Sequence, residues 1–520
     1  MEYCIRKVAR ALFREVALPK PRLLLVLLLP LIIATTGAQR SAAALTIDET
    51  RHLLGRTAFG AGPQDFKIFE PMNRTEAVRY LIGNVRRIAL TPSPAWASDS
   101  APMYLPSRTK EERKMGPRRR TKEEREARRT LRRSRSRDLK VWWLTEMLYT
   151  PSPFSERMTL FWHNHFTSSL RKVKRARLLL RQNHMLRRHA LGNFATLLNV
   201  MARDPAMVVY LDSRRNKLGR PNENFARELL EVFTLGEGHY TELDVKEAAR
   251  AFTGWSIKRH SGDFSFRTRK HDFGLKHFMG STGRFGGEEI LNILLEDPRT
   301  SHFVVKKLWR AFVSDSDEPA EMRRLAADFR GSGYDISALM MSILTTEAFW
   351  APENRGRLVK APTDLVIGTL RFFDVRPTNI FRTVRLIRAL GQDLFDPPNV
   401  KGWTGGVSWM TSNRLLRRVQ FLRNVIKGKR LRARQRATRV ASSRSVVNLS
   451  GTNAMDDSMP EMEDDRRMKM VPLVMVPNRL LRENLETSLV PIAPIQAIND
   501  DGGWKDRLRY VVLDPVFQLK

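Results

Sequence analysis

The sequence predicts a mainly α-helical protein, built as one large helical domain or as two helical subdomains, with a small β-hairpin near residues 255–270. Three observations predict this. Apolar residues recur at helical spacing in most segments after residue 45, capping residues and prolines stand at segment starts, and one stretch alternates apolar and polar residues around a turn. No sequence period of about 20 to 50 residues occurs, which disfavours a repeat solenoid.

Start and stop signals place the first group of helices. Ser152 before Pro153 is typical of an N-cap followed by the first helical residue, Gly192 ends a basic segment, and Thr241 with Asp244 has the spacing of a capping box. Asn222 or Asn224 is expected to cap the helix that ends at Gly236. The expected helices are 153–169, 171–191, 193–204, 205–211, 222–236 and 241–254.

The hairpin is predicted next along the chain. Residues 255–258 and 264–267 alternate apolar and polar side chains on either side of Ser261-Gly262-Asp263, a turn-forming triplet. Helices then resume, and they are expected over 288–313, 320–332, 336–349, 361–373 and 380–390.

The N-terminus has the order of a secretory signal peptide. A basic leader precedes an apolar run over 23–34, and Ala42 and Ala44 fit a small-residue cleavage pattern. We therefore expect residues 1–44 to be a cleaved signal peptide and the protein to be exported, periplasmic or extracellular. The alternative is an uncleaved anchor in the inner membrane over residues 23–38. The single cysteine, Cys4, lies in this leader, so cleavage would leave residues 45–520 without any thiol for a disulfide or metal site.

The net charge of +36 favours a polyanionic partner, such as an acidic polysaccharide or another polyanion of the cell envelope. The alternative is a solvated basic surface that binds nothing. Nucleic acid is disfavoured, because the chain has an export signal and no known nucleic-acid module. Two segments stand out as insertions in the domain: 108–140 holds 16 Lys/Arg against 6 Asp/Glu and is expected to be partly an exposed helix, and 427–470 is expected to be disordered.

Histidines and acids supply the candidate metal ligands. His163 and His165 are two residues apart, which separates them by about 200° on a regular helix, so they cannot chelate one ion together. A divalent metal site would have to assemble from several segments, and the predicted ligands are His163, Asp212, His271 and Asp272. His165 is expected to be a hydrogen-bonded core histidine.

Paired carboxylates supply the candidate catalytic groups. Glu223 and Glu228 share the polar arc of the helix after Asn222, and together with His239 they are predicted to provide acid–base chemistry. Arg227 on the same arc is a predicted binding residue. The alternative is a solvated face held by Glu–Arg pairs.

A Gly- and Pro-rich loop supplies the remaining binding candidates. Lys401, Trp403 and Trp409 lie within 396–409, where exposed indoles would stack on sugar rings and buried indoles would fill the core. A nucleophile elbow, a P-loop and a dinucleotide fingerprint are absent from suitable contexts, which disfavours serine hydrolases and nucleotide enzymes.

Ordered motifs along nearly the whole of 45–520 carry a resemblance to a known family. The most specific are Leu160-Phe161-Trp162-His163-Asn164-His165-Phe166, Pro221-Asn222-Glu223-Asn224-Phe225-Ala226-Arg227-Glu228-Leu229, Ala249-Arg250-Ala251-Phe252-Thr253-Gly254-Trp255, Pro397-Pro398-Asn399-Val400-Lys401-Gly402-Trp403 and Leu513-Asp514-Pro515-Val516-Phe517-Gln518-Leu519. With these motifs the chain resembles the family catalogued as domain of unknown function 1800. The resemblance implies an exported bacterial protein, often encoded beside a sulfatase-like exported protein, with no established activity. The basic 108–140 run and the mixed-charge 427–467 segment depart from the family pattern.

Two functions follow as alternatives. One is a metal-dependent enzyme acting on an acidic polymer of the envelope or its surroundings, with a pocket that joins the residues named above. The other is a non-catalytic polyanion-binding or assembly protein, with a continuous basic surface and exposed Trp403 and Trp409.

Overall fold

The computed structural model describes residues 43–98, 121–258, 261–426, 479–496 and 503–520. Contacts divide the chain into Met1–Ala44, of which only the last two residues are described, and Leu45–Lys520. Three parts of the chain lie outside the described residues: residues 1–42 of the predicted signal peptide 1–44, most of the first half of the charged run 108–140, and residues 427–478, which include the predicted disordered segment 427–470. None of the helices in the described ranges combines the length and hydropathy needed to cross a bilayer.

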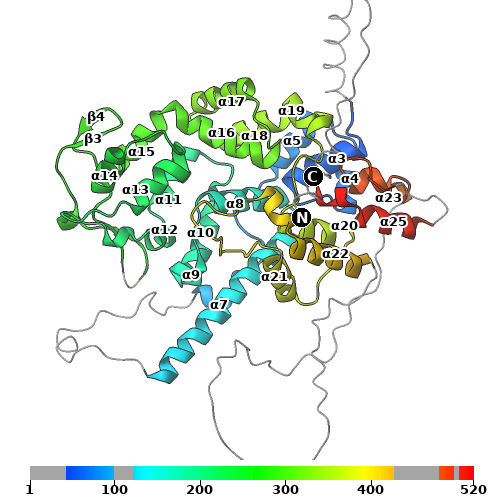
Figure 1. Ribbon diagram of the computed structural model, residues 1–520, viewed down its shortest axis with the longest axis horizontal. Coiled ribbons are helices and arrows are strands. Elements are labelled where there is room, and N and C mark those ends of the chain that lie inside the picture. The colour runs from blue at the N-terminus through cyan, green and yellow to red at the C-terminus, as the bar shows by residue number, and fades with distance from the viewer. Residues whose placement is uncertain (1–42, 99–120, 259–260, 427–478, 497–502) are drawn as a thin grey trace, which may run out of the picture. The chain divides into compact units, whose positions relative to one another are not determined.

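The described part of Leu45–Lys520 is mainly helical with two short hairpins, which confirms the predicted fold class (Figure 1). Its first half contains α3 (Ile47–Thr57), α4 (Pro63–Phe69), α5 (Arg74–Gly83), η1 (Ala95–Ser98), α7 (Lys122–Tyr149), α8 (Pro153–His165), α9 (Leu170–Val173), α10 (Ala176–His189), α11 (Phe194–Ala202), α12 (Pro205–Tyr210), η2 (Ser213–Arg215), α13 (Asn224–Glu228), the π-helix η3 (Leu229–Thr234) and α14 (Glu242–Ala251). Its second half contains β1 (Trp255–Ile257), β2 (Phe264–Phe266), η4 (Thr268–Lys270), β3 (Lys276–Phe278), β4 (Ser281–Gly283), α15 (Gly287–Glu296), α16 (Pro298–Phe312), α17 (Pro319–Gly331), α18 (Ile336–Thr345), α19 (Glu347–Trp350), η5 (Pro352–Asn354), α20 (Pro362–Phe372), α21 (Ile380–Ala389), η6 (Gly406–Met410), α22 (Ser412–Ile426), α23 (Arg479–Glu483), α24 (Leu485–Leu489), α25 (Trp504–Leu513) and η7 (Pro515–Gln518).

Capping residues start many of these helices as the sequence predicts. The Thr241 hydroxyl accepts a hydrogen bond from the Asp244 amide at 3.1 Å, and the Asp244 carboxylate accepts one from the Thr241 amide at 2.9 Å. This reciprocal pair satisfies two amides that the first turn of α14 leaves free. The helix before it differs from the prediction, because its N-cap is Glu223 rather than either asparagine.

Three segments predicted as single helices are each two helices. Lys174 adopts a left-handed backbone with φ of 57° and separates α9 from α10. Asp297 and Pro298 separate α15 from α16, since proline has no amide hydrogen to continue the first helix and Asp297 caps the second. Thr346 caps α19 in the same way and ends α18. The predicted helix 153–169 also stops early, at His165.

Both hairpins are antiparallel. The predicted one is confirmed, with Trp255 opposite Phe266 and Ile257 opposite Phe264. The second, β3–β4, has strands of three residues, too short to show alternation in the sequence. It turns through Met279 and Gly280, which both have positive φ, as the tightest hairpin turns require.

Buried ion pairs tie the central helices together. Glu156 of α8 accepts two hydrogen bonds from the Arg187 guanidinium of α10, at 2.5 and 2.8 Å, and one from the Trp143 indole of α7 at 2.7 Å. Both charged side chains are 1% exposed. A buried pair of this kind is stable only when further hydrogen bonds satisfy the charges, as the indole does here.

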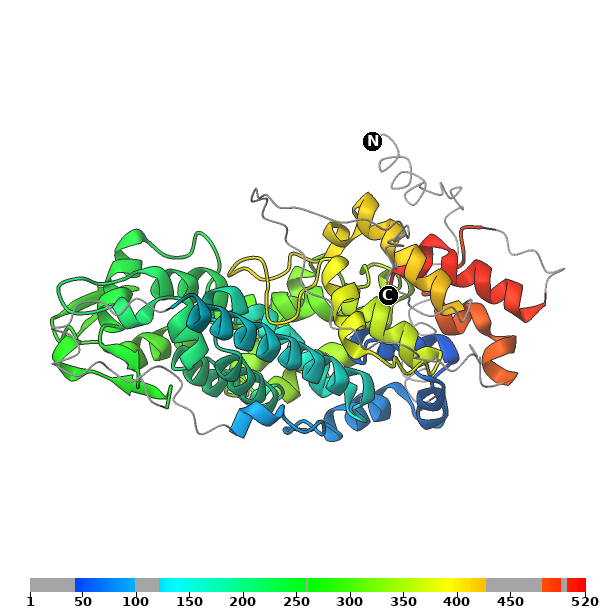
Figure 2. The ribbon, with the colours of Figure 1, turned by 90° about the horizontal axis from the view of Figure 1, so that it is seen from below.

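The first half of α7 is a solvent-exposed basic helix, and its second half packs into the core through Leu139, Trp142 and Trp143. This confirms that part of the charged run is an exposed helix. Figures 1 and 2 show α7 in cyan, the hairpins with α12 to α15 at one end of this unit, and α3 with α20 and α22 to α25 at the other.

Candidate functional site

The segment after Glu228 is a π-helix, a rare form that often marks functional sites. Its wider turn leaves carbonyl groups that need donors from outside the helix. The Lys307 ammonium donates to the Val232 carbonyl at 2.9 Å, and the His165 Nε2 donates to the Phe233 carbonyl at 3.2 Å. Lys307 also donates to His165 Nδ1 at 3.2 Å. His165 therefore supports the π-helix from within the core, as the sequence predicts, and burial with the nearby Lys307 charge holds its pKa well below the usual range.

Glu228 lies at the start of this π-helix and is half-buried. Burial and the neighbouring Glu231 raise the pKa of Glu228 to about 7, although Lys401, Arg227 and Lys172 oppose the shift. A carboxyl group with this pKa is protonated in part at neutral pH, which suits a general acid. Glu228, one of the predicted catalytic residues, thus combines partial burial with a strongly raised pKa.

The other two predicted catalytic residues have different surroundings. Glu223 accepts a hydrogen bond from Arg227 at 3.2 Å, and Arg227 also reaches Glu242 at 2.7 and 2.8 Å. These contacts connect α13 to the start of α14, as the Glu–Arg alternative predicts. His239 is exposed, and its carbonyl accepts from Arg299 at 3.2 Å.

His163 is 1% exposed and lies among aromatic rings. Its ring centroid is 5.2 Å from Trp143, 5.4 Å from Phe395 and 5.9 Å from Trp403. Neither ring nitrogen has a hydrogen-bond partner among the described residues. Burial lowers the pKa of His163 to about 3, so the imidazole is neutral.

The remaining predicted metal ligands are held by other groups. Asp212 pairs with Lys172 at 3.1 Å, and Asp272 pairs with Arg250 at 2.8 Å. His271 donates from Nδ1 to the Thr253 carbonyl at 2.9 Å. In the ranges that the structure describes, no three His, Cys, Asp or Glu side chains lie together as a metal site requires. Asp212, Asp272 and His271 therefore contact Lys172, Arg250 and Thr253, and they do not gather with His163 into a group of metal ligands.

The Gly- and Pro-rich loop takes the second of its two expected forms. Trp403 is 7% exposed and Trp409 is 5% exposed, so the indoles fill the core and are not exposed for stacking on sugar rings. The Asn164 carboxamide accepts from the Trp403 amide at 2.7 Å and holds the loop against α8, which turns the indole inward. Lys401 is exposed and pairs with Glu231 at 3.0 Å and Glu237 at 3.1 Å.

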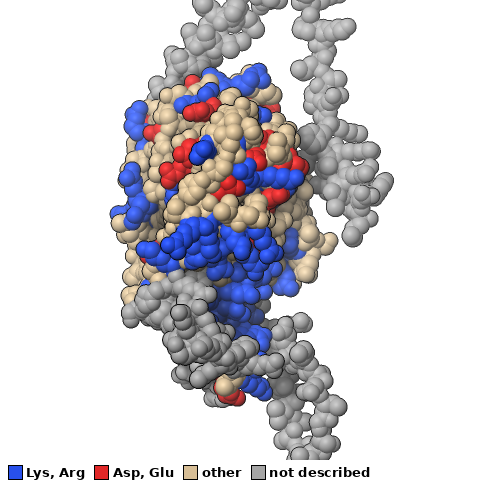
Figure 3. Space-filling model, turned by 90° about the vertical axis from the view of Figure 1, so that its left-hand side faces the viewer, with Lys and Arg blue, Asp and Glu red and all other residues tan. Residues whose placement is uncertain are grey.

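A basic surface lies beside Glu228. Its residues come from separate segments, which the sequence alone did not group together. We call it the basic face, and it consists of Arg171, Lys172, Lys174, Arg175, Arg177 and Arg181 on α9 and α10, Arg214, Arg215, Lys217 and Arg220 around η2, and Arg267, Arg269 and Lys270 around η4. The elements are contiguous, since α9 packs on α12, α12 packs on η2, and the Leu218 amide donates to the Lys270 carbonyl at 2.7 Å. Figure 3 shows a band of Lys and Arg across this end of the molecule.

Most of the basic face is not neutralised. Three of its members pair with acids: Arg171 with Asp396, Lys172 with Asp212, and Arg181 with Asp263. Seven others make no ion pair with any described residue, namely Lys174, Arg215, Lys217, Arg220, Arg267, Arg269 and Lys270. Exposed apolar side chains lie on the same segments, with Leu218 55% and Phe266 46% exposed. The sequence contains a local signal for this surface in two runs without acids, 214–220 and 267–270. The hairpin of the folded protein brings these two runs together.

The fold and these sites define a mainly α-helical domain with a carboxyl group of raised pKa at a π-helix and an adjacent basic face. A family model described as "Protein of unknown function (DUF1800)" matches residues 52–519, and the chain belongs to this family. No curated protein and no solved structure matches the chain.

Proposed function

We propose that the protein is an exported polyanion-binding protein whose basic face binds an acidic polysaccharide of the cell envelope or its surroundings. The observation that carries this proposal is the contiguous set of seven cations on the basic face that make no ion pair with any described residue. Such a set raises the local concentration of a polyanion and releases its counterions on binding.

The alternative of a merely solvated basic surface is less well supported. Solvated faces usually intersperse both signs of charge, as α17 does, where Arg324 pairs with Glu321 at 2.6 Å and with Asp328 at 2.7 Å. The segments 214–220 and 267–270 contain no acid at all. Exposed Leu218 and Phe266 add apolar contact area, which suits the faces of sugar rings.

The test uses purified residues 45–520 and three ligands: dextran sulfate, polygalacturonate and neutral dextran. A Lys217→Glu, Arg220→Glu, Lys270→Glu variant is expected to bind both polyanions at least about tenfold more weakly at low salt, because six units of charge change on the basic face. A control variant, Lys67→Glu, Arg79→Glu, Arg323→Glu, makes the same charge change at exposed residues of α4, α5 and α17. Equal losses in the two variants would show only a response to net charge and would refute a specific face.

A second candidate function rests on Glu228. Its raised pKa and its interaction with Lys172 of the basic face suit it as the acid that protonates a glycosidic oxygen of a polymer bound there. The wild type is expected to cleave polygalacturonate, and Glu228→Gln is expected to lose this activity. The measurement is the number of new reducing ends. Cleavage that persists in Glu228→Gln and disappears in Glu223→Gln would assign the acid role to Glu223 instead of Glu228.

Metal dependence is tested separately by elemental analysis with inductively coupled plasma mass spectrometry. The comparison is between residues 45–520 and a His163→Ala, Glu228→Ala variant. A stoichiometric divalent ion that is lost in the variant would restore the metal-dependent enzyme. If neither protein retains an ion and both fold, the enzyme proposal depends on Glu228 acting without a metal.

A further inference from the structure

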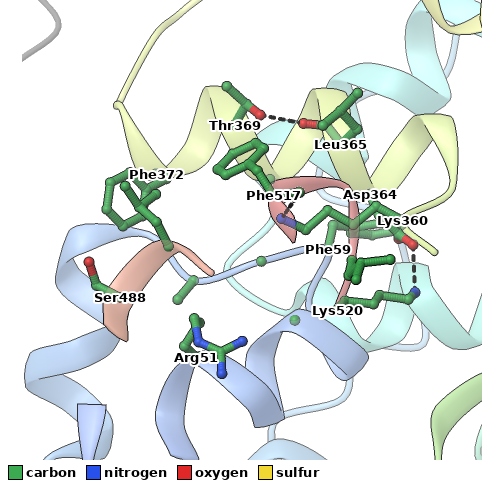
Figure 4. Close-up of a pocket in the computed structure, with 16 residues that line it drawn as sticks. Arg51, Phe59, Lys360, Asp364, Leu365, Thr369, Phe372, Ser488, Phe517 and Lys520 are labelled. Carbon is green, nitrogen blue, oxygen red and sulfur yellow. Dashed lines mark hydrogen bonds and ion pairs between the residues drawn. The ribbon is translucent and has the colours of Figure 1, made fainter. Parts of the chain in front are cut away.

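A pocket far from the basic face lies between α3, α20, α24 and the segment after α25 (Figure 4). The space inside it that a water-sized group can occupy is about 50 Å³, and counting the open mouth brings the empty space to about 530 Å³. Its walls are mainly apolar, and they are formed by Phe59, Leu365, Phe372, Leu489, Phe517 and Leu519. Three cations, Arg51, Lys360 and Lys520, also line it, together with one acid, Asp364. Figure 4 shows the Lys520 ammonium directed at Asp364 and the Lys360 ammonium beside Phe517, while Arg51 comes from α3.

The charge around this pocket is not balanced by side chains. Asp364 pairs with Arg157 and accepts from the Lys520 ammonium at 2.5 Å. Arg56 and Arg418, both 0% exposed, add two more cations to the cluster. At the outer rim, Asp48 pairs with Arg51 and is shared with Arg355. Seven cations thus outnumber three carboxylates, namely Asp48, Asp364 and Asp315, the last of which acts on Arg56. Buried groups seldom carry such an excess without a further anion.

Several donors in this cluster remain available. Lys360 donates to the Phe517 carbonyl at 2.8 Å and lies 4.0 Å from the centre of the Phe517 ring, while its ammonium has two further hydrogens. Arg56 Nε and Nη1 and Arg418 Nε are buried and have no hydrogen-bond partner among the described residues. Arg418 otherwise donates to Gln518 at 3.1 Å and to the Lys360 carbonyl at 2.8 Å, which holds Lys360 at the pocket. Polar atoms of this kind are rarely left unsatisfied in a folded core.

Glycines keep the pocket open. Gly55 lies in the interior of α3, where glycine destabilises a helix by about 1 kcal/mol relative to alanine. A Cβ atom at Gly55 would meet no other atom within 4 Å, so packing does not require glycine there. Gly368 differs, because a Cβ atom there would lie 2.3 Å from the Phe59 carbonyl. Gly55 therefore leaves free volume in the pocket wall, whereas Gly368 allows two backbones to pack.

We propose that this pocket binds a small organic oxyanion, a carboxylate or a phosphate monoester, whose charged group lies among Arg51, Lys360 and Lys520 and whose apolar part packs against the phenylalanine rings. The oxyanion offsets the excess positive charge and accepts hydrogen bonds from the two ammonium groups. The apolar walls favour an organic acid over an inorganic ion. The site is separate from the basic face, so a polymer and this ligand can bind together.

The test measures the midpoint of thermal unfolding with phenyl phosphate, benzoate, inorganic phosphate and benzyl alcohol, against potassium chloride at equal ionic strength. Phenyl phosphate and benzoate at millimolar concentration are expected to raise the midpoint by several degrees, inorganic phosphate by less, and benzyl alcohol not at all. Calorimetric titration then gives the affinity. No shift with either aromatic anion would refute the proposal.

Variants locate the site. Gly55→Leu fills the open volume and is expected to abolish the anion-dependent shift, whereas Gly83→Leu, at a second helical glycine with open space around it, is expected to retain it. Lys360→Met is expected to weaken the response at least about fivefold in ligand concentration. The basic-face variant Lys217→Glu, Arg220→Glu, Lys270→Glu is expected to respond as the wild type does. If the anion-dependent rise of the unfolding midpoint were lost in the basic-face variant and kept in Gly55→Leu, the anion would bind on the basic face, and the proposal of a pocket ligand would be wrong.

Discussion

The basic face and the buried pocket both concentrate positive charge, yet the same kinds of side chain behave differently in them. On the basic face, cations such as Lys217 and Lys270 are exposed and hydrated. In the pocket, burial lowers the pKa of Lys360 and of Lys520 to about 7. Water stabilises the first set without any partner, while the second set needs a carboxylate, the loss of a proton or a bound anion.

This difference explains the distinct roles proposed for the two regions. Exposed cations add their effects over a wide area and are screened by salt, which suits a long polyanion of variable structure. Buried cations act at short range in a shaped cavity, which suits one small anion. Three predictions separate these two kinds of charge, and a fourth concerns two buried imidazoles that carry no charge.

The largest expected effect is that of the buried acid Asp364. Asp364→Asn leaves Arg157 and Lys520 without their carboxylate, and we expect a loss of about 3–5 kcal/mol of unfolding free energy at pH 6. Asp212→Asn removes the partner of exposed Lys172 and should cost less than about 1 kcal/mol. Urea unfolding of both variants measures the difference. Similar losses would show that burial does not distinguish the two acids.

Salt should affect the two regions unequally. Raising potassium chloride from 0.05 to 0.2 M is expected to weaken binding of dextran sulfate to the basic face about 100-fold or more, as counterion release requires for several neutralised charges. The phenyl phosphate affinity of the pocket should fall by less than about threefold, since buried pairs are poorly screened. Parallel titrations of both ligands at the two salt concentrations measure this. Equal sensitivity would mean that both ligands bind at the surface.

The pH dependence of stability should report the buried lysines. The pKa of Lys360 and that of Lys520 are lowered from 10.5 to about 7 by burial and by the charges of Arg51, Arg56, Arg157 and Arg418, which Asp364 only partly offsets. Between pH 7 and 10.5 the unfolded chain therefore binds more protons than the folded protein, so the unfolding free energy rises with pH in this window, by about 1.4 kcal/mol per pH unit for each lysine.

The measurement is urea unfolding from pH 6.5 to 9.5, with Lys360→Met expected to flatten the rise. Saturating phenyl phosphate should flatten it as well, because the anion favours the protonated amines. A stability that falls over this range in the wild type would contradict the assignment.

The smallest expected effect concerns two neutral imidazoles. His163→Leu removes a buried ring whose nitrogens have no partner, so stability should stay constant or rise by up to about 1 kcal/mol. His165→Leu removes the donor to the Phe233 carbonyl and the acceptor for Lys307, and should cost about 2 kcal/mol or more. Thermal unfolding of both variants compares them. A large loss in His163→Leu alone would point to a ligand of that ring.

Local signals predicted much of the secondary structure. The capping box at Thr241 and the hairpin turn after Lys258 were read correctly, because short-range hydrogen bonds and turn geometry decide such features. The breaks at Asp297-Pro298 and Thr346 follow the same capping and proline rules, although the longer apolar patterns predict one helix across each of them. These local rules could not predict the π-helix, because its carbonyl groups accept hydrogen bonds from Lys307 and His165, which are distant in the sequence.

By itself, the sequence determined the helical class, the family and the basic character of the chain. Periodicity and ordered motifs depend on the order of residues along the chain, and net charge depends on composition, so none of them requires the folded structure. The tertiary structure decided which charges are exposed and which are buried. Arg220 and Lys270 look alike in the sequence to Arg56 and Lys520, and only packing makes the first pair surface cations and the second pair buried ones. Desolvation depends on all the segments that surround a group, and those segments meet only in the folded protein.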